Sequence, residues 1–174
     1  MTAELGHFAL IMALFISATQ ALVPFLGAYR GHHPWMALAI PTAILQFFLV
    51  ALAFGCLIHV YIISDFSVVN VASNSHTAKP LIYKISGSWG NHEGSLLLWV
   101  LILSLFGAAV AVFGDNLPLT LKARVLAVQA AIAVSFYLFM ILTSNPFERI
   151  FPPPLNGQGL NPLLQDPGLA LHPP

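Results

Sequence analysis

The sequence predicts an all-α integral membrane protein with four membrane-spanning helices. Hydrophobic residues make up 58% of the 174 residues, charged residues only 7%, and the mean hydropathy is +0.85. Charged residues account for about a quarter of an average soluble domain, so a water-soluble fold could not cover this much apolar surface. Four stretches with almost no charge are long enough to cross a bilayer, which takes about 20 helical residues.

The four predicted spans are residues 5–28, 36–64, 95–113 and 126–143. A long polar loop, 65–94, joins the second span to the third, and a proline-rich tail, 144–174, follows the fourth. A cleaved secretory signal has basic residues before its apolar core, and no Lys or Arg precedes the first apolar run here. We therefore expect this run to remain as a membrane helix. An even number of spans places both termini, the loop and the tail on one side of the membrane.

The basic residues near the span ends predict the orientation. The short links hold Arg30, Lys122 and Arg124, and the other side holds Lys79, Lys84 and Arg149. Cytoplasmic segments are enriched in Lys and Arg close to the spans. The two counts are equal, but Lys79 and Lys84 lie midway along the long loop, away from the span ends. They therefore count less toward the orientation than the basic residues of the short links. We therefore expect the termini, the loop and the tail to be on the outer side, which is periplasmic in a bacterium.

Charge and cysteine content exclude several classes of function. Six basic residues balance six acidic residues, so the chain has no basic field that would attract nucleic acid. Cys56 is the single cysteine, which excludes an internal disulfide, a Cys-x-x-Cys redox pair and a cysteine-based metal site.

The spans suggest two hypotheses for the function of the chain: a transporter or channel-like module, and a structural subunit. His7 and His59 lie near span ends, and Pro24 and Pro41 predict kinks, so a small transporter or channel-like module could run a polar path through the bundle. The near absence of charge in the spans counts against it, and a packing role also accounts for both histidines. Small residues along the last two spans instead allow close helix packing, as in a structural subunit of a larger membrane complex.

Three residues are candidates for a cofactor site: Trp89, His92 and His172. Imidazole is a frequent ligand of metals and haem iron. Trp89 and His92 lie together before the third span and could line a flat aromatic ligand, although Asn91 and Glu93 beside them also fit a helix cap. Two prolines follow His172 and restrict the backbone there, which suits a ligand residue but equally suits an ordinary surface loop.

Three segments resemble the CcmF family of cytochrome c maturation proteins. They are Trp-Gly-Asn-His-Glu-Gly-Ser-Leu-Leu-Leu-Trp at 89–99, Thr-Ser-Asn-Pro-Phe-Glu-Arg at 143–149, and residues 161–174, which end in His-Pro-Pro. The segments occur in the family's order, and the flanking spans fit its N-terminal region. The resemblance places the start of a cytochrome c assembly domain near residue 89.

The resemblance implies haem transport and a haem lyase. Such a protein accepts haem b, its substrate and cofactor, from the haem chaperone CcmE. It then helps to join the haem covalently to apocytochrome c at the outer face of a bacterial or mitochondrial inner membrane. A thiol-handling subunit such as CcmH is a further expected partner, besides membrane lipid. By motif match His172 is an iron ligand, with Trp89 and His92 against the haem, and no catalytic residue is assigned.

The resemblance covers only the first part of the usual family chain. The family's second outer histidine, its tryptophan-rich segment and the histidines of a membrane-embedded haem would all lie beyond Pro174. We therefore expect this chain to need the C-terminal part of a CcmF to complete a six-coordinate haem site or to act in haem ligation.

Overall fold

The structure, a computed structural model, describes residues 1–159 and residue 168. Its helices are α1 (Thr2–Arg30), α2 (His33–Ala37), α3 (Ala39–Ile62), α4 (Val69–Asn74), α5 (Leu81–Gly87), α6 (His92–Phe113) and α7 (Leu119–Leu142). Four helical stretches are long and apolar enough to cross a membrane: α1, α2 together with α3, α6 and α7. The prediction of an all-α protein with four membrane spans is confirmed.

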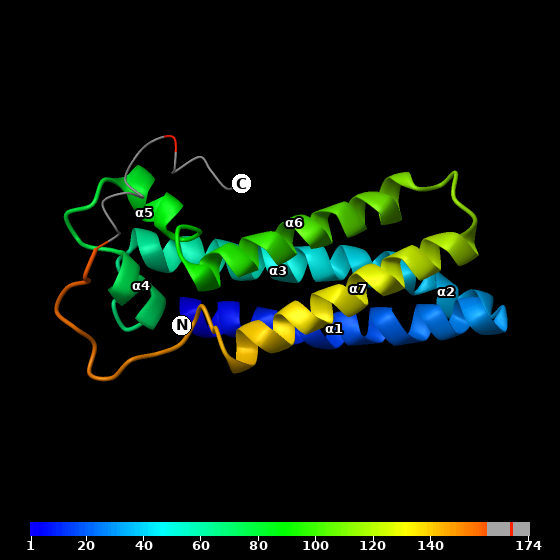
Figure 1. Cartoon of the computed structure of the whole chain (residues 1–174), viewed down its shortest axis with the longest axis horizontal. Coiled ribbons are helices and arrows are strands. Elements are labelled where there is room, and N and C mark those ends of the chain that lie inside the picture. The colour runs from blue at the N-terminus through cyan, green and yellow to red at the C-terminus, as the bar shows by residue number, and fades with distance from the viewer. Residues whose placement is uncertain (160–167, 169–174) are drawn as a thin grey trace.

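The four long helices form an elongated up-and-down bundle (Figure 1). In it α1 packs against α3 and α7, while α6 packs against the same two helices from the other side. One end, here called the loop end, holds the N-terminus, residues 63–91 with α4 and α5, and residues 143–159. The opposite linker end holds the short connections 31–38 and 114–118.

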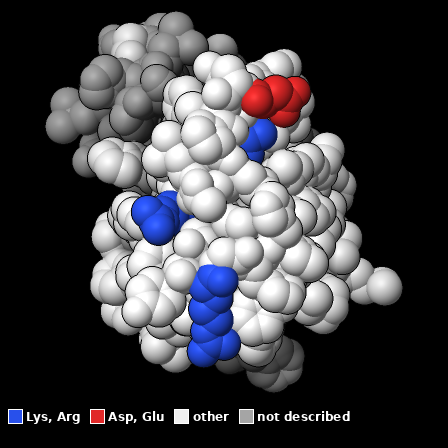
Figure 2. Space-filling view, turned by 90° about the vertical axis from the view of Figure 1, so that its right-hand side faces the viewer, with Lys and Arg blue, Asp and Glu red and all other residues white. Residues whose placement is uncertain are grey.

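The linker end is closed by a buried lysine. Lys122, at the start of α7, is only 4% exposed, and its Nζ lies 3.4 Å from the carbonyl oxygen of Ala111 and 3.4 Å from Asp115 Oδ1. A cation at the C-terminal end of α6 complements the negative end of that helix dipole. Figure 2 shows this end of the molecule, with separate basic side chains and one acidic group on an otherwise uncharged face.

The two span prolines have different effects. Helix α1 continues through Pro24, whereas the second span is interrupted at Leu38, between α2 and α3. Pro41 lies in the first turn of α3 and has no amide hydrogen, so the carbonyl of Ala37, four residues earlier, loses its helical donor. The interruption therefore falls where the missing hydrogen bond would have joined the two helices.

Two buried glutamines cross-link the bundle. Gln20 of α1 donates its Nε2 hydrogen to the carbonyl of Leu126 at 3.1 Å, and Gln46 of α3 donates to the Tyr137 hydroxyl at 3.0 Å. All three side chains involved are at most 4% exposed. Because lipid offers no hydrogen-bond partners, polar side chains in a span are stabilised by pairing between helices. Both pairs end on α7 and tie it to α1 and α3.

Phe147 anchors the segment after α7. Its ring is 4% exposed and lies against Gly6 of α1 and Cys56 of α3. A Cβ at position 6 would overlap the Phe147 ring, so the close approach requires the glycine. Asn145 accepts a hydrogen bond from the Phe147 amide at 3.0 Å and turns the chain into this position.

Arg149 fixes the same segment to two other parts of the loop end. It forms ion pairs with Glu4 of α1 and with Asp65, the latter at 3.1 Å. Beside it, backbone hydrogen bonds of 2.9 Å join Val69 to Glu148 and Ile150 to Ser67. The segment after α7 is thereby bound to both α1 and the long loop.

Replacing Phe147 with alanine should destabilise the bundle by about 3 kcal/mol, because it empties a buried site between α1 and α3. The free energy of unfolding in detergent micelles would measure this loss. The matched control is Phe113→Ala, since Phe113 is 82% exposed. Equal stability losses for the two variants would contradict the anchoring role.

Candidate functional site

The site that the sequence predicts is built around the first turn of α6. Asn91 is the N-cap: its Oδ1 accepts a hydrogen bond from the Gly94 amide at 2.8 Å, which confirms the predicted helix cap. Its Nδ2 donates to the carbonyl of Gly87 at 2.7 Å and to the Tyr61 hydroxyl at 3.0 Å. One side chain thus joins α6 to α5 and to the end of α3.

A second amide extends this network into the long loop. Asn70 of α4 is 5% exposed and accepts a hydrogen bond from the Tyr61 hydroxyl. Its Nδ2 donates to Asn91 at 2.8 Å and to Glu93 Oε2 at 3.2 Å. These four residues form one connected network, and it holds α3, α4 and the start of α6 in a fixed relation.

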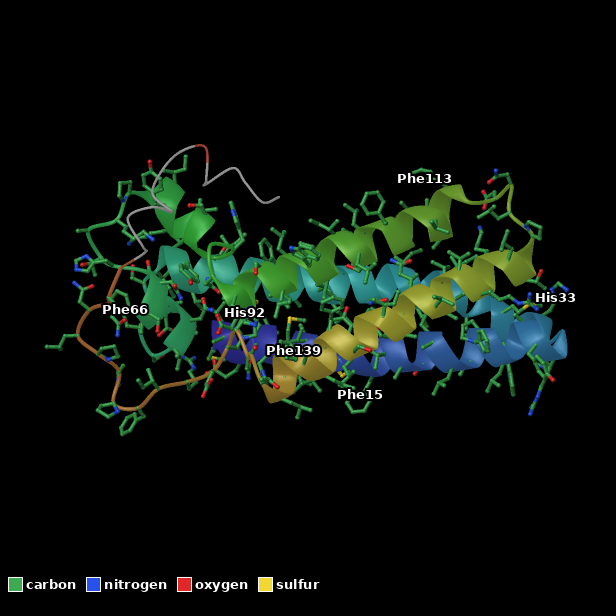
Figure 3. The ribbon with its side chains drawn as sticks, in the orientation of Figure 1. Phe15, His33, Phe66, His92, Phe113 and Phe139 are labelled. Atoms are coloured by element: carbon green, nitrogen blue, oxygen red, sulfur yellow. The ribbon has the colours of Figure 1, made fainter. Side chains whose placement is uncertain are left out.

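Trp89 and His92 lie on either side of this cap. The Trp89 ring is half-buried and stacks on Phe54 of α3, with ring centroids 6.4 Å apart and planes inclined by 24°. His92 is exposed, and its ring meets Phe139 of α7 edge-on at 6.1 Å (Figure 3). Each ring is therefore held by an aromatic neighbour from a different helix, and both belong to the loop end.

The third predicted residue, His172, lies outside the described residues. Of the others, His7, His59 and His76 belong to the loop end, and His32 and His33 to the linker end. Within residues 1–159 no group of three or more His, Cys, Asp or Glu side chains could hold a metal ion. Trp89 and His92 both lie at the loop end, where their rings pack against different helices.

Two charged groups of the loop end, Asp65 and Lys79, have shifted pKa values and hydrogen bonds within the protein. Burial alone would raise the pKa of Asp65, but hydrogen bonds from Ser67 and Arg149 hold it below its usual range. Burial, together with the nearby charge of Lys84, lowers the pKa of Lys79 to about 8. Lys79 donates to the carbonyl of Asn74 at 3.1 Å, so its ammonium is directed into the loop.

Comparison with known proteins identifies the family. The model of the "Cytochrome C assembly protein" family matches residues 89–174. Cytochrome c-type biogenesis protein ccl1 of Rhodobacter capsulatus is 58% identical over the whole chain, which covers 27% of that protein. CycK of Rhizobium meliloti is 59% identical (whole chain, 26% of the relative), and CcmF of Escherichia coli is 47% identical (whole chain, 27% of the relative).

A solved structure, Cytochrome c Heme Lyase CcmF, superposes with a TM-score of 0.80 at 29% identity, over 85% of this chain and 25% of that one. The chain belongs to the CcmF family. It spans about a quarter of the length of the curated relatives it matches, and it corresponds to the N-terminal part of the family.

The match to the "Cytochrome C assembly protein" family begins at Trp89, shortly before the cap of α6. The sequence alone indicated the cap and the two aromatic residues, but it did not indicate Tyr61 and Asn70, which support them. Those two residues lie 30 and 21 positions before Asn91, and no local pattern links them to it. Gly94 of the motif signals a close approach of the backbone, because a Cβ there would overlap the carbonyl oxygen of Ser88, but it does not point to Tyr61 or Asn70.

Gly94→Ala should destabilise the protein by about 1–3 kcal/mol, because the new methyl group has no room beside the Ser88 carbonyl. Thermal unfolding in detergent would measure the loss. Gly55→Ala is the matched control, since no atom lies within 4 Å of a Cβ at that helical position. Unfolding at the same temperature in both variants would show that the turn before α6 tolerates a side chain.

Proposed function

We propose that this chain forms part of a CcmF-type haem lyase that acts in cytochrome c maturation. The observation that carries the proposal is the match along the whole chain to cytochrome c biogenesis proteins, at 58% identity for ccl1. The proposed reaction joins haem to apocytochrome c. Each cysteine thiol adds across a haem vinyl group, so that a carbon–sulfur bond forms and the thiol hydrogen moves to the other vinyl carbon.

Haem, taken from the chaperone CcmE, supplies the reactive vinyl groups and the iron in this proposal. The residues of this chain bind and orient it: the Trp89 ring offers an aromatic surface, and His92 and His172 offer imidazole nitrogens. The stacking of Trp89 on Phe54 and the edge contact of His92 with Phe139 support this assignment, since both rings are held before any ligand arrives. Further iron ligation would come from the rest of a CcmF protein.

The proposed location is a bacterial inner membrane with the loop end on the periplasmic side. The linker end has a net excess of basic groups. Its basic residues are Arg30, Lys122 and Arg124, and its acidic residue is Asp115. Basic residues close to span ends favour the cytoplasmic side. The candidate haem residues would then face apocytochrome c and a thiol-handling subunit such as CcmH, outside the membrane.

A transporter or channel-like module is less well supported. His59 is exposed on the surface of the bundle, and the interior is filled by fully buried side chains such as Leu10, Leu57 and Leu97. A polar path needs polar side chains facing a water-filled interior. The matched relatives carry names of cytochrome c biogenesis proteins, which also favours haem attachment over transport.

His172→Ala should abolish cytochrome c maturation when this chain is produced together with the remaining part of a CcmF, because an iron ligand is lost. Covalent haem on a reporter cytochrome c, scored by haem stain, is the measurement. His92→Ala should reduce the stain severalfold, since His92 would contact the haem without being its main ligand.

The matched control is His33→Ala, at the linker end, which should leave the haem stain unchanged. Protein levels of all variants would be compared by immunoblot, so that loss of the protein is distinguished from loss of haem attachment. Full maturation with His172→Ala would refute the role of this histidine, and full maturation with both His172→Ala and His92→Ala would refute the proposed haem site on this chain.

A further inference from the structure

A groove with a volume of about 370 Å³ runs along α7 on the surface of the bundle. It is lined by Arg124, Val125, Val128, Gln129 and Ile132, which recur at the helical period and therefore share one face of the helix. Positions 124 to 132 span about 12 Å of helix. Because the hydrocarbon core of a bilayer is about 30 Å thick, the length of the groove matches the depth of one leaflet.

The side chain of Gln129 places the groove at the seam between α6 and α7. Its Nε2 donates a hydrogen bond to the carbonyl oxygen of Leu103, and the amide lies against Gly107. The polar group of Gln129 is thereby directed toward α6 and not toward the bilayer. The surface that the groove presents to lipid is the apolar one of Val128 and Ile132, which are 54% and 48% exposed.

Arg124 forms the polar end of the groove. It lies in the second turn of α7, close to the linker end, and its side chain is exposed. None of the ion pairs among the described residues includes it, and Asp115, the acidic residue of the linker end, pairs with Lys122. The positive charge of Arg124 is therefore available to an anion at the level of the lipid headgroups.

We propose that this groove binds one anionic phospholipid of the leaflet at the linker end. The lipid phosphate would accept hydrogen bonds from the guanidinium of Arg124, whose planar set of donors suits a phosphate group. One acyl chain would lie along Val125, Val128 and Ile132. Basic sites between membrane helices on the cytoplasmic side are typical binding places of anionic headgroups, and the linker end is proposed above to be cytoplasmic.

A membrane helix from the remainder of a CcmF protein is the competing occupant. Such a helix would need an acidic side chain opposite Arg124, because a charge covered by apolar side chains within the membrane is costly. An anionic lipid carries its charge at one end and its apolar chain at the other, in the order in which the groove presents Arg124 and the apolar residues. The distribution of charge along the groove therefore favours a lipid.

A lipid bound here would pack beside Gln129, the residue that joins this part of α7 to α6. It would stabilise that contact against separation of the two helices. The groove lies toward the linker end, whereas Trp89 and His92 belong to the loop end, so lipid binding does not depend on the proposed haem site.

The test is photocrosslinking of a full CcmF protein that contains this chain, with benzoylphenylalanine in place of Val128. The nanodiscs contain equal parts of phosphatidylcholine and phosphatidylglycerol, and one of the two lipids is radiolabelled in each sample. Phosphatidylglycerol should label the protein about fivefold more than phosphatidylcholine, as one basic residue near an anionic lipid allows. The same probe at Leu138, which is exposed on α7 outside the groove, should show no preference.

The preference should disappear in Arg124→Gln and be partly retained in Arg124→Lys, which keeps the charge but not the planar donors. The matched control is Arg30→Gln, because Arg30 is also exposed near the linker end but does not line the groove. Its loss should leave the lipid preference unchanged. Folding of the Arg124 variants is expected, since this side chain is exposed.

Thermal unfolding in detergent provides a second readout. Added phosphatidylglycerol should raise the unfolding temperature of the protein and of Arg30→Gln but not that of Arg124→Gln, since a ligand stabilises the state it binds. Equal labelling by both lipids at position 128 would overturn the proposal and indicate ordinary boundary lipid. Crosslinks to protein without crosslinks to lipid would also overturn it, because a helix of the remaining CcmF would then fill the groove. An unchanged preference in Arg124→Gln would contradict the role of the guanidinium.

Discussion

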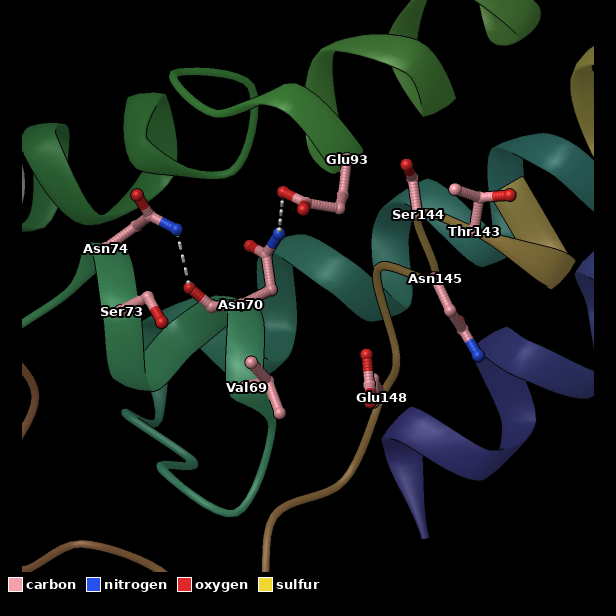
Figure 4. A pocket seen from close by; sticks show the side chains of 9 residues that line it. All are labelled: Val69, Asn70, Ser73, Asn74, Glu93, Thr143, Ser144, Asn145 and Glu148. Atoms are coloured by element: carbon pink, nitrogen blue, oxygen red, sulfur yellow. Dashed lines mark hydrogen bonds between the residues drawn. The ribbon is translucent and has the colours of Figure 1, made fainter. Parts of the chain in front are cut away.

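The hydrogen bonds of Asn91 are the constraint on which the loop end depends. The N-terminal amides of α6 have no partner inside their own helix, and Asn91 satisfies one of them while its amide group reaches α5 and Tyr61. Asn70, which Figure 4 draws, then joins the same network from α4. Every donor of this network has a protein acceptor, so the network itself buries no unpaired donor, whereas the buried hydroxyl groups of Ser75 and Ser86 elsewhere in the loop have no described partner.

The bundle below depends on a different requirement. In lipid the hydrophobic effect does not drive helices together, so association rests on close packing and on polar pairs. Ser104, Gly107 and Ala111 of α6 are buried, in keeping with the packing role expected for small residues of that span. The buried hydrogen bonds of Gln20 and Gln46 add direction to this packing, because each joins a specific position on α7 to another helix.

The sequence predicted those features that depend on local composition. Four uncharged runs predicted the four spans, because a membrane helix needs a continuous apolar stretch. Asn91 was recognisable as a cap from its place before α6. The partners of Trp89 and His92 were not predictable, since Phe54 and Phe139 come from other helices and only the folded bundle brings them near. The short helices α4 and α5 were also missed, because six or seven residues in a polar loop show no period.

The contact of Phe147 with Gly6 has a consequence for how this family can change over evolution. The Phe147 ring occupies the space that any side chain at position 6 would need, and the side chain of Cys56 also borders that space. A larger residue at position 6 would be tolerated only together with a smaller one at position 147. These two positions, 141 residues apart in the chain, should therefore covary among homologues, and an aromatic residue at 147 should accompany glycine at 6.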